Sequence, residues 1–137
     1  MDQIFVDSDI VLDLLSARKP HYTHAADLFS LSDLGMVDLY VSSLTFANIN
    51  YILSRQYSSV KARKIILKFN TLVKVLPVNE KIINLALLSD FDDFEDAIQY
   101  HAALAANLKI LLTRNLKDFK KSTITVLTAQ QYLKTFS

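Results

Sequence analysis

The segment Ile4-Phe5-Val6-Asp7-Ser8-Asp9-Ile10-Val11 decides the fold of this chain. Its first three residues form an apolar run that is too short for a helix and suits a buried strand. After the acidic turn, apolar residues recur at helical spacing as far as Leu15, and Pro20 ends that element. A strand, an acidic turn and a helix in this order are typical of the first unit of an α/β protein.

The same alternation continues to the end of the chain. Short apolar runs predict four more strands, and the amphipathic segments between them predict helices. The predicted strands are 39–41, 72–76, 110–112 and 124–127, and the predicted helices are 21–34, 44–57, 59–69, 79–88, 94–108 and 129–136. Short continuous apolar strands that alternate with helices predict an α/β fold in which a parallel sheet is covered on both faces. In such a sheet, ligands bind beyond the carboxyl ends of the strands.

Length and composition restrict the classes of protein that remain. The 137 residues, 51% of them hydrophobic, suit a single domain over 1–137 with one core. The absence of cysteine excludes disulfides and thiolate ligands. There is no basic region of the kind that begins a signal peptide, and no apolar run approaches the ~18 residues of a membrane span. We therefore expect a cytoplasmic protein without a membrane partner.

The stretch Asp90-Phe91-Asp92-Asp93-Phe94-Glu95-Asp96 carries five carboxylates in seven residues. One interpretation is helix initiation, because acidic side chains favour a helix N-terminus, with Asp93 as the N-cap and Asp96 three residues later. The other interpretation is a divalent cation held by oxygen ligands. Which of the two applies depends on whether other carboxylates reach the same place.

Three acidic residues are predicted to meet at one edge of the sheet. Asp7 directly follows the first strand, Asp118 lies a few residues past strand 110–112, and Asp96 opens the helix that leads into that strand. Carboxylates that converge without neutralising lysines suit Mg²⁺ or Mn²⁺. Such a cation can activate water and clamp a phosphodiester. The ordinary alternatives are a helix N-cap for Asp7 and a turn residue for Asp118.

Taken together, these motifs resemble the PIN domain family, of the VapC-like bacterial toxin kind. The residues that carry the resemblance are Phe5-Val6-Asp7-Ser8-Asp9-Ile10-Val11-Leu12-Asp13, Val41-Ser42-Ser43-Leu44-Thr45, Asp96-Ala97, and Thr113-Arg114-Asn115 with Asp118-Phe119. The resemblance implies a three-layer α/β/α sandwich with a five-stranded parallel sheet. It also implies a metal-dependent ribonuclease, the toxin of a type II toxin–antitoxin pair, with an antitoxin partner and a homodimeric state.

The resemblance assigns roles to particular residues. Asp7, Asp96 and Asp118 match the catalytic acids that hold Mg²⁺ or Mn²⁺. Thr113 and Asn115 match residues that orient this site. Ser8 occupies a position that is usually small and polar.

One position departs from the family pattern. The family usually has a Glu on the helix after the second strand, and this chain has Asn48 there. An amide oxygen can hold a metal or its water but brings no charge. Glu95 or Asp93 could supply the missing charge. We expect Asn48→Glu to raise metal affinity unless the acidic stretch already completes the site.

Basic residues are candidates for contacts to RNA phosphates. Arg114 and Lys117 flank the predicted site and are favoured by that position. Further basic residues lie on the helix 59–69, where a solvated face is the ordinary explanation; they are Lys61, Arg63, Lys64 and Lys68. The histidines at 21, 24 and 101 show no pairing with a nucleophile and lack further ligands for zinc.

Two alternatives to the nuclease stay open at this point. The run Asp7-Ser8-Asp9-Ile10-Val11 also resembles the opening motif of haloacid-dehalogenase phosphatases, in which Asp7 would be the nucleophile and Asp9 a general acid. The other alternative is a catalytically weak PIN module that binds RNA or a protein partner, which Asn48 favours. Asp9→Asn should abolish a phosphatase and only weaken a nuclease. Absence of Mg²⁺ or Mn²⁺ binding in a titration would favour the weak PIN module.

Overall fold

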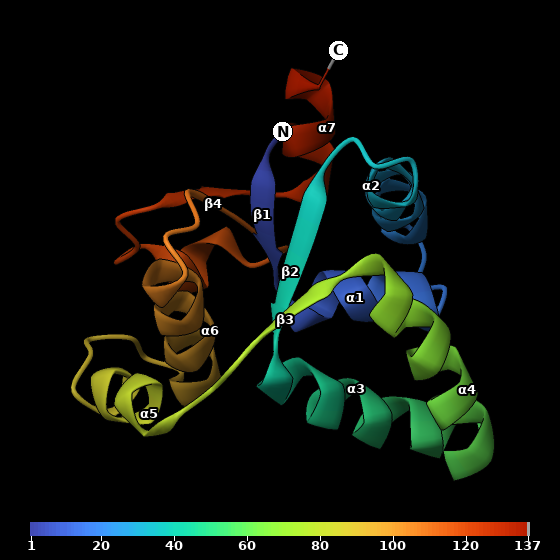
Figure 1. Cartoon of the computed structure of the whole chain (residues 1–137), viewed down its shortest axis with the longest axis horizontal. Helices are drawn as coiled ribbons and strands as arrows, with labels where there is room; N and C mark the ends of the chain where they lie inside the picture. The colour runs from blue at the N-terminus through green and yellow to red at the C-terminus, as the bar shows by residue number, and fades with distance from the viewer. Residues whose placement is uncertain (137) are drawn as a thin grey trace.

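The computed structural model describes residues 1–136 and contains all five predicted strands in one parallel sheet (Figure 1). The strands lie in the order β3-β2-β1-β4-β5. Their bounds are β1 Gln3–Val6, β2 Asp38–Ser42, β3 Lys74–Leu76, β4 Ile110–Leu112 and β5 Thr125–Leu127. The predicted five-stranded parallel sheet is therefore confirmed.

The predicted helices also form, with small differences at their ends. Their bounds are α1 Ser8–Leu15, α2 Tyr22–Asp33, α3 Ser43–Gln56, α4 Ser59–Phe69, α5 Glu80–Leu87, α6 Phe94–Ala105 and α7 Ala129–Thr135, with 3₁₀ turns η1 Asn70–Leu72 and η2 Leu116–Phe119. Helix α6 ends three residues before the predicted Leu108, because Asn107 adopts a left-handed conformation with φ +60°. The η1 turn shortens the predicted third strand at its start.

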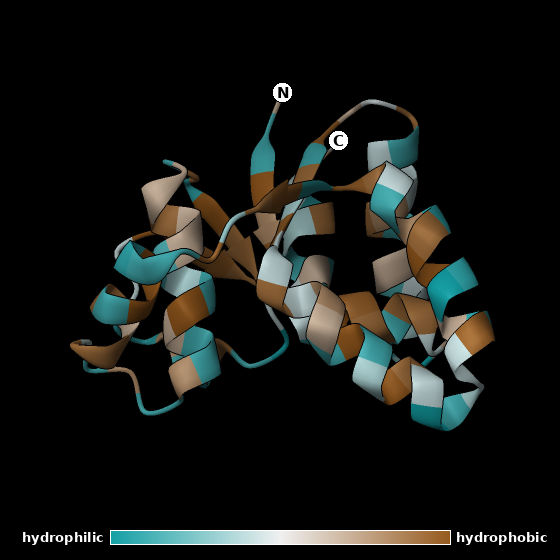
Figure 2. Ribbon diagram, turned by 60° about the horizontal axis from the view of Figure 1, so that its bottom comes forward, coloured by the Kyte–Doolittle hydropathy of each residue, from teal (hydrophilic) through white to brown (hydrophobic). Residues whose placement is uncertain are grey.

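Helices cover both faces of the sheet. Ile4 and Val6 of β1 pack against α1, α2, α3 and α7, whereas Phe5 points to the opposite face and packs with Tyr100 of α6. Helix α5 packs on the outer side of α6. Figure 1 shows α5 and α6 on one side of the central strands and α1 to α4 on the other. Figure 2 shows mostly hydrophobic strands between helices of mixed character. The three-layer α/β/α sandwich is confirmed.

The order of the strands in the sheet changes direction at the boundary between β1 and β4. The strands β1, β2 and β3 follow one another outward in one direction, and β4 then returns to the other side of β1. The ladder of β1 and β4 continues beyond the strands, since the Asp7 amide donates to the Leu112 carbonyl at 2.9 Å. Asp7 and Thr113 therefore lie side by side at the carboxyl edge, where ligands bind in sheets of this type.

Within residues 1–136, no helix is both long enough and apolar enough to span a bilayer.

Candidate functional site

A cleft of about 250 Å³ opens at the carboxyl edge of the sheet. It brings together the three acidic residues that the sequence analysis singled out and several others. Six of the nine lining residues are carboxylates, and the lining consists of Asp7, Ser8, Asp9, Asp93, Glu95, Asp96, Gln99, Asn115 and Asp118. In the described part of the chain, the lining includes no lysine or arginine to neutralise these charges.

Asp7 is held in place by two neighbouring segments. As the N-cap of α1, it accepts a hydrogen bond from the Ser8 amide at 2.8 Å through Oδ1. Its Oδ2 accepts from the hydroxyl of Thr113, a fully buried residue, at 2.9 Å. The N-cap interpretation and the site interpretation of Asp7 are thus compatible, because capping fixes the direction of the carboxylate.

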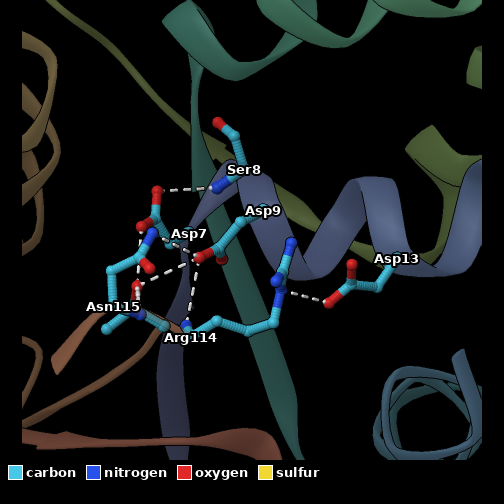
Figure 3. Close-up of polar contacts among 7 residues, drawn as sticks. Asp7, Ser8, Asp9, Asp13, Arg114 and Asn115 are labelled. Atoms are coloured by element: carbon cyan, nitrogen blue, oxygen red, sulfur yellow. Dashed lines mark hydrogen bonds and ion pairs between the residues drawn. The ribbon is translucent and has the colours of Figure 1, made fainter. Parts of the chain in front are cut away.

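Asp9 is a site residue that the nuclease interpretation of the sequence missed. Its Oδ2 accepts hydrogen bonds from the Arg114 amide at 3.1 Å and from the Asn115 side-chain amide at 3.3 Å (Figure 3). Its Oδ1 is buried and has no hydrogen-bond partner within the described residues. The available signal was its position two residues after Asp7, in the first turn of α1.

The acidic stretch forms the start of α6. The Asp93 side chain accepts a hydrogen bond from the Asp96 amide at 2.9 Å, so Asp93 is the predicted N-cap. This cap fixes the first helical turn, and Asp93, Glu95 and Asp96 all reach the cleft from it. Helix initiation and the gathering of charge at the cleft are therefore achieved by the same residues.

Asn48 approaches the site through Glu95. Its side-chain amide donates a hydrogen bond to the Glu95 carboxylate, which joins α3 to the first turn of α6. Asn48 is not among the residues that line the cleft. Asn48, which the resemblance aligns with a Glu of the family, therefore contacts Glu95 in this chain.

Gln99 lies beneath the acidic side chains and was not identified from the sequence. It accepts a hydrogen bond from the Ser42 hydroxyl at 2.5 Å, and its amide donates to Ser8 and Thr45 at 3.2 Å each. Gln99 is only 2% exposed and follows Asp96 by three residues on α6. This network connects the helices that carry Asp7 and Asp96. The only sequence signal was one uncharged polar residue within an otherwise apolar stretch of α6.

The crowded carboxylates change one another's proton affinity. Burial, followed by the neighbouring charge of Asp9, raises the pKa of Asp7 to about 8. Burial, followed by the charges of Asp93 and Asp118, raises the pKa of Asp96 to about 7. Burial also raises the pKa of Asp9. Perturbations of this size are typical of functional sites.

The basic residues proposed for RNA binding differ in their surroundings. The Arg114 guanidinium points to Asp13, with Nε 2.9 Å from Oδ2, and so turns toward α1 (Figure 3). Lys117 is exposed on η2. The four basic residues of α4 are exposed as well, and the Lys61 ammonium lies 4.4 Å from the ring centroid of Tyr57. His21 and His24 line a separate cavity of about 150 Å³ beside Asp13 and Arg114.

The donor set of the cleft fits a hard cation, although the ligands are not preassembled. Its side chains offer carboxylate, amide and hydroxyl oxygens, which suit Mg²⁺ or Mn²⁺. Among residues 1–136, no three His, Asp or Glu side chains are spaced so that they could hold a metal ion as they stand. Like charges oppose a closer approach, and a bound cation would remove that opposition.

Comparison with known proteins places this geometry in a family. A family model described as PIN domain matches residues 3–117. The chain belongs to the PIN domain family. No curated protein matches it.

Three solved structures with the same fold illustrate the similarity. The DNA-bound VapBC from Salmonella typhimurium has a TM-score of 0.71 and 16% identity, and the match covers 94% of this chain and 99% of that one. VapBC-1 from nontypeable Haemophilus influenzae has a TM-score of 0.68 and 20% identity, with coverage of 93% and 98%. VapC20 from Mycobacterium tuberculosis, described as a sarcin-ricin loop cleaving toxin, has a TM-score of 0.63 and 17% identity, with coverage of 79% and 86%.

Proposed function

We propose that this protein is a metal-dependent endoribonuclease. The observation that carries the proposal is the cleft at the carboxyl edge of the sheet, in which six carboxylates meet without a neutralising lysine or arginine among the lining residues described. Membership of the PIN domain family supports it, and it favours a nuclease over the phosphatase alternative.

The protein's side chains would act by holding a cation, and the cation would in turn bind the scissile phosphate. Asp7, Asp96 and Asp118 would hold Mg²⁺ or Mn²⁺, which supplies activation of a water and charge neutralisation at the phosphodiester. Thr113 and the Ser8 amide keep both Asp7 oxygens oriented. The pKa values of Asp7 and Asp96 are raised to about 8 and about 7, so each carboxylate is protonated in part of the molecules near neutral pH. A bound cation would displace these protons.

Glu95 is the best candidate for the fourth carboxylate of the site. It lines the cleft, its charge contributes to the raised pKa of Asp96, and Asn48 donates a hydrogen bond to it. Asn48 would then support a carboxylate rather than replace one. This contact favours a competent nuclease over a weak PIN module that only binds RNA or a protein. Asp93 serves as the N-cap and is the less favoured ligand.

The similar structures support a proposal about partners. One structure of this fold, from Klebsiella pneumoniae, is described as a toxin-antitoxin complex, and VapC20 is described as a sarcin-ricin loop cleaving toxin. We propose that this chain is likewise a toxin with an antitoxin partner and that it forms a homodimer. Sedimentation of the purified protein, with and without the product of an adjacent reading frame, tests both points.

The decisive experiment is cleavage of RNA by the purified protein. Cleavage should require Mg²⁺ or Mn²⁺, stop on addition of chelator, and fall by at least about a hundredfold in Asp7→Ala. Asp27→Asn removes one exposed carboxylate from α2, far from the cleft in sequence and fold, and serves as the matched control. Cleavage that persists in chelator and in Asp7→Ala would rule the proposal out.

A further inference from the structure

Arg114 connects the loop after β4 to both acidic residues of α1. Its backbone amide donates to Asp9 Oδ2 at 3.1 Å, and its side-chain Nε lies 2.9 Å from Asp13 Oδ2. Asp9 and Asp13 are four residues apart and therefore lie one turn apart on the same side of α1. Figure 3 shows the Arg114 side chain running along α1 between these two carboxylates.

The partner of Arg114 is buried. Asp13 is 1% exposed, and neither its Oδ1 nor the Nε of Arg114 has a hydrogen-bond partner in the described chain, so charge attraction rather than a hydrogen bond joins the pair. Withdrawal of the guanidinium would remove the largest opposite charge that acts on this buried carboxylate and leave only the weaker influence of His21 and Arg18, which is unfavourable. The Arg114 side chain is 31% exposed, but its Nε faces Asp13, whereas Lys117 is exposed on η2.

The residues on either side of Arg114 hold the acids of the cleft. Thr113 donates to Asp7 at 2.9 Å, and Asn115 donates through its side chain to Asp9 at 3.3 Å. The Asn115 amide donates back to the Thr113 hydroxyl at 3.1 Å, which closes a compact loop. Any displacement of this loop from α1 would move donors away from both carboxylates at once.

We propose that Arg114 is a positioning residue that locks residues 113–115 onto α1 through Asp13, and that it is not a contact for RNA phosphates. The lock keeps Asp7 and Asp9 directed into the cleft. The catalytic consequence rests on the proposed nuclease function, but the lock itself can be measured without RNA. The alternative that the sequence favoured, a phosphate contact by Arg114, predicts a different result in each experiment below.

The first experiment measures amide hydrogen exchange at residue 114 in the metal-free protein. The variant is Asp13→Leu with Arg114→Met, which removes the pair without leaving a buried charge. The Leu side chain is larger than that of Asp13, and the cavity that Asp13 lines gives it room. Exchange at residue 114 should become at least about tenfold faster, because the hydrogen bond to Asp9 opens more often. Exchange in the central strand β1 should change much less.

A conservative variant provides the rescue. The ion pair is made by Nε, so the ammonium of Arg114→Lys, one bond further along the side chain, can reach Asp13. Arg114→Lys should keep slow exchange at residue 114 and an unchanged affinity for Mn²⁺, whereas the double variant should bind Mn²⁺ about tenfold more weakly. Unchanged exchange at residue 114 in the double variant would overturn the proposal.

The second experiment measures the salt dependence of RNA affinity in an Asp96→Asn background that does not cleave. If Arg114 is committed to Asp13, the double variant leaves the slope of log affinity against log salt unchanged. A phosphate contact would instead reduce that slope by about 0.7 for single-stranded RNA, and this result would also overturn the proposal. Lys117→Gln is the control that should show the reduction. If the Asp96→Asn protein does not bind RNA, that result counts against the nuclease function alone. The positioning role of Arg114 is still tested by amide exchange at residue 114.

Discussion

The side-chain amide of Asn48 on α3 donates a hydrogen bond to the carboxylate of Glu95 on α6. These residues are 47 positions apart, and their contact joins α3 to the first turn of α6, from which Glu95 lines the acidic cleft. The resemblance to the family leads us to expect a Glu at position 48. In this chain the amide found there instead donates to a carboxylate from another helix.

This contact alters what we expect of Asn48→Glu. A second carboxylate would replace a donor beside Glu95, so Mn²⁺ affinity should stay unchanged or fall, and the metal-free protein should lose stability near pH 8. Calorimetric titration with Mn²⁺ and thermal unfolding check this. Asn50→Glu makes the same charge change on an exposed position of α3 and is the control. A clear rise in Mn²⁺ affinity would show that Glu95 does not complete the site.

Thr113→Val tests the orientation of Asp7. The substitution keeps the size of a fully buried side chain and removes the hydroxyl that donates to Asp7 and accepts from the Asn115 amide. We expect a loss of about 1–3 kcal/mol in the free energy of unfolding, because buried polar groups lose their partners. Denaturant unfolding measures it. Thr125→Val, at an exposed position of the edge strand β5, should change stability by much less.

The stability of the metal-free protein should fall as the pH rises from about 4 to about 8. The pKa of Asp7 is about 8 in the folded protein against 3.8 for the unperturbed group, so the folded state keeps a proton that the unfolded state releases across this range. The unfolded state therefore binds fewer protons, and stability decreases with pH until Asp7 has ionised in both states.

One substitution and one addition of metal identify the source of the decrease in stability with pH. Asp7→Asn should flatten the decrease and raise stability near pH 8, since Asn can still cap α1. Saturating Mn²⁺ should restore much of the stability of the unsubstituted protein near pH 8, because the cation binds the ionised site. Thermal unfolding over pH with chelator or Mn²⁺ measures both effects. A flat profile in chelator would contradict the clustering of charge described for the cleft.

Gln99→Leu tests the buried network beneath the acids. It removes three hydrogen bonds, to Ser42, Ser8 and Thr45, at about 1 kcal/mol each. We expect a total loss of about 3 kcal/mol and a weaker affinity for Mn²⁺, because Asp96 is placed by the same turn of α6. Gln130→Leu on an exposed position of α7 is the control. Stability equal to that of the control would show that the network contributes little.

The sequence by itself determined the strands, the helices, the positions of Asp7 and Asp118 after strands and the position of Asp96 at a helix start. These features depend on local patterns, such as apolar runs of strand length and caps within one turn. Asp93 as N-cap of α6 was readable for the same reason, since it caps an amide three residues away.

Only the tertiary structure decided which side chains contact one another in and around the cleft. The contacts of Asn48 with Glu95, of Gln99 with Ser8 and of Arg114 with Asp13 join residues that are far apart along the chain. Local periodicity predicts which face of an element is buried, but not the direction of a polar side chain that has several partners within reach. That choice follows from how α1, α3 and α6 converge on the carboxyl edge of the sheet, which depends on packing throughout the core.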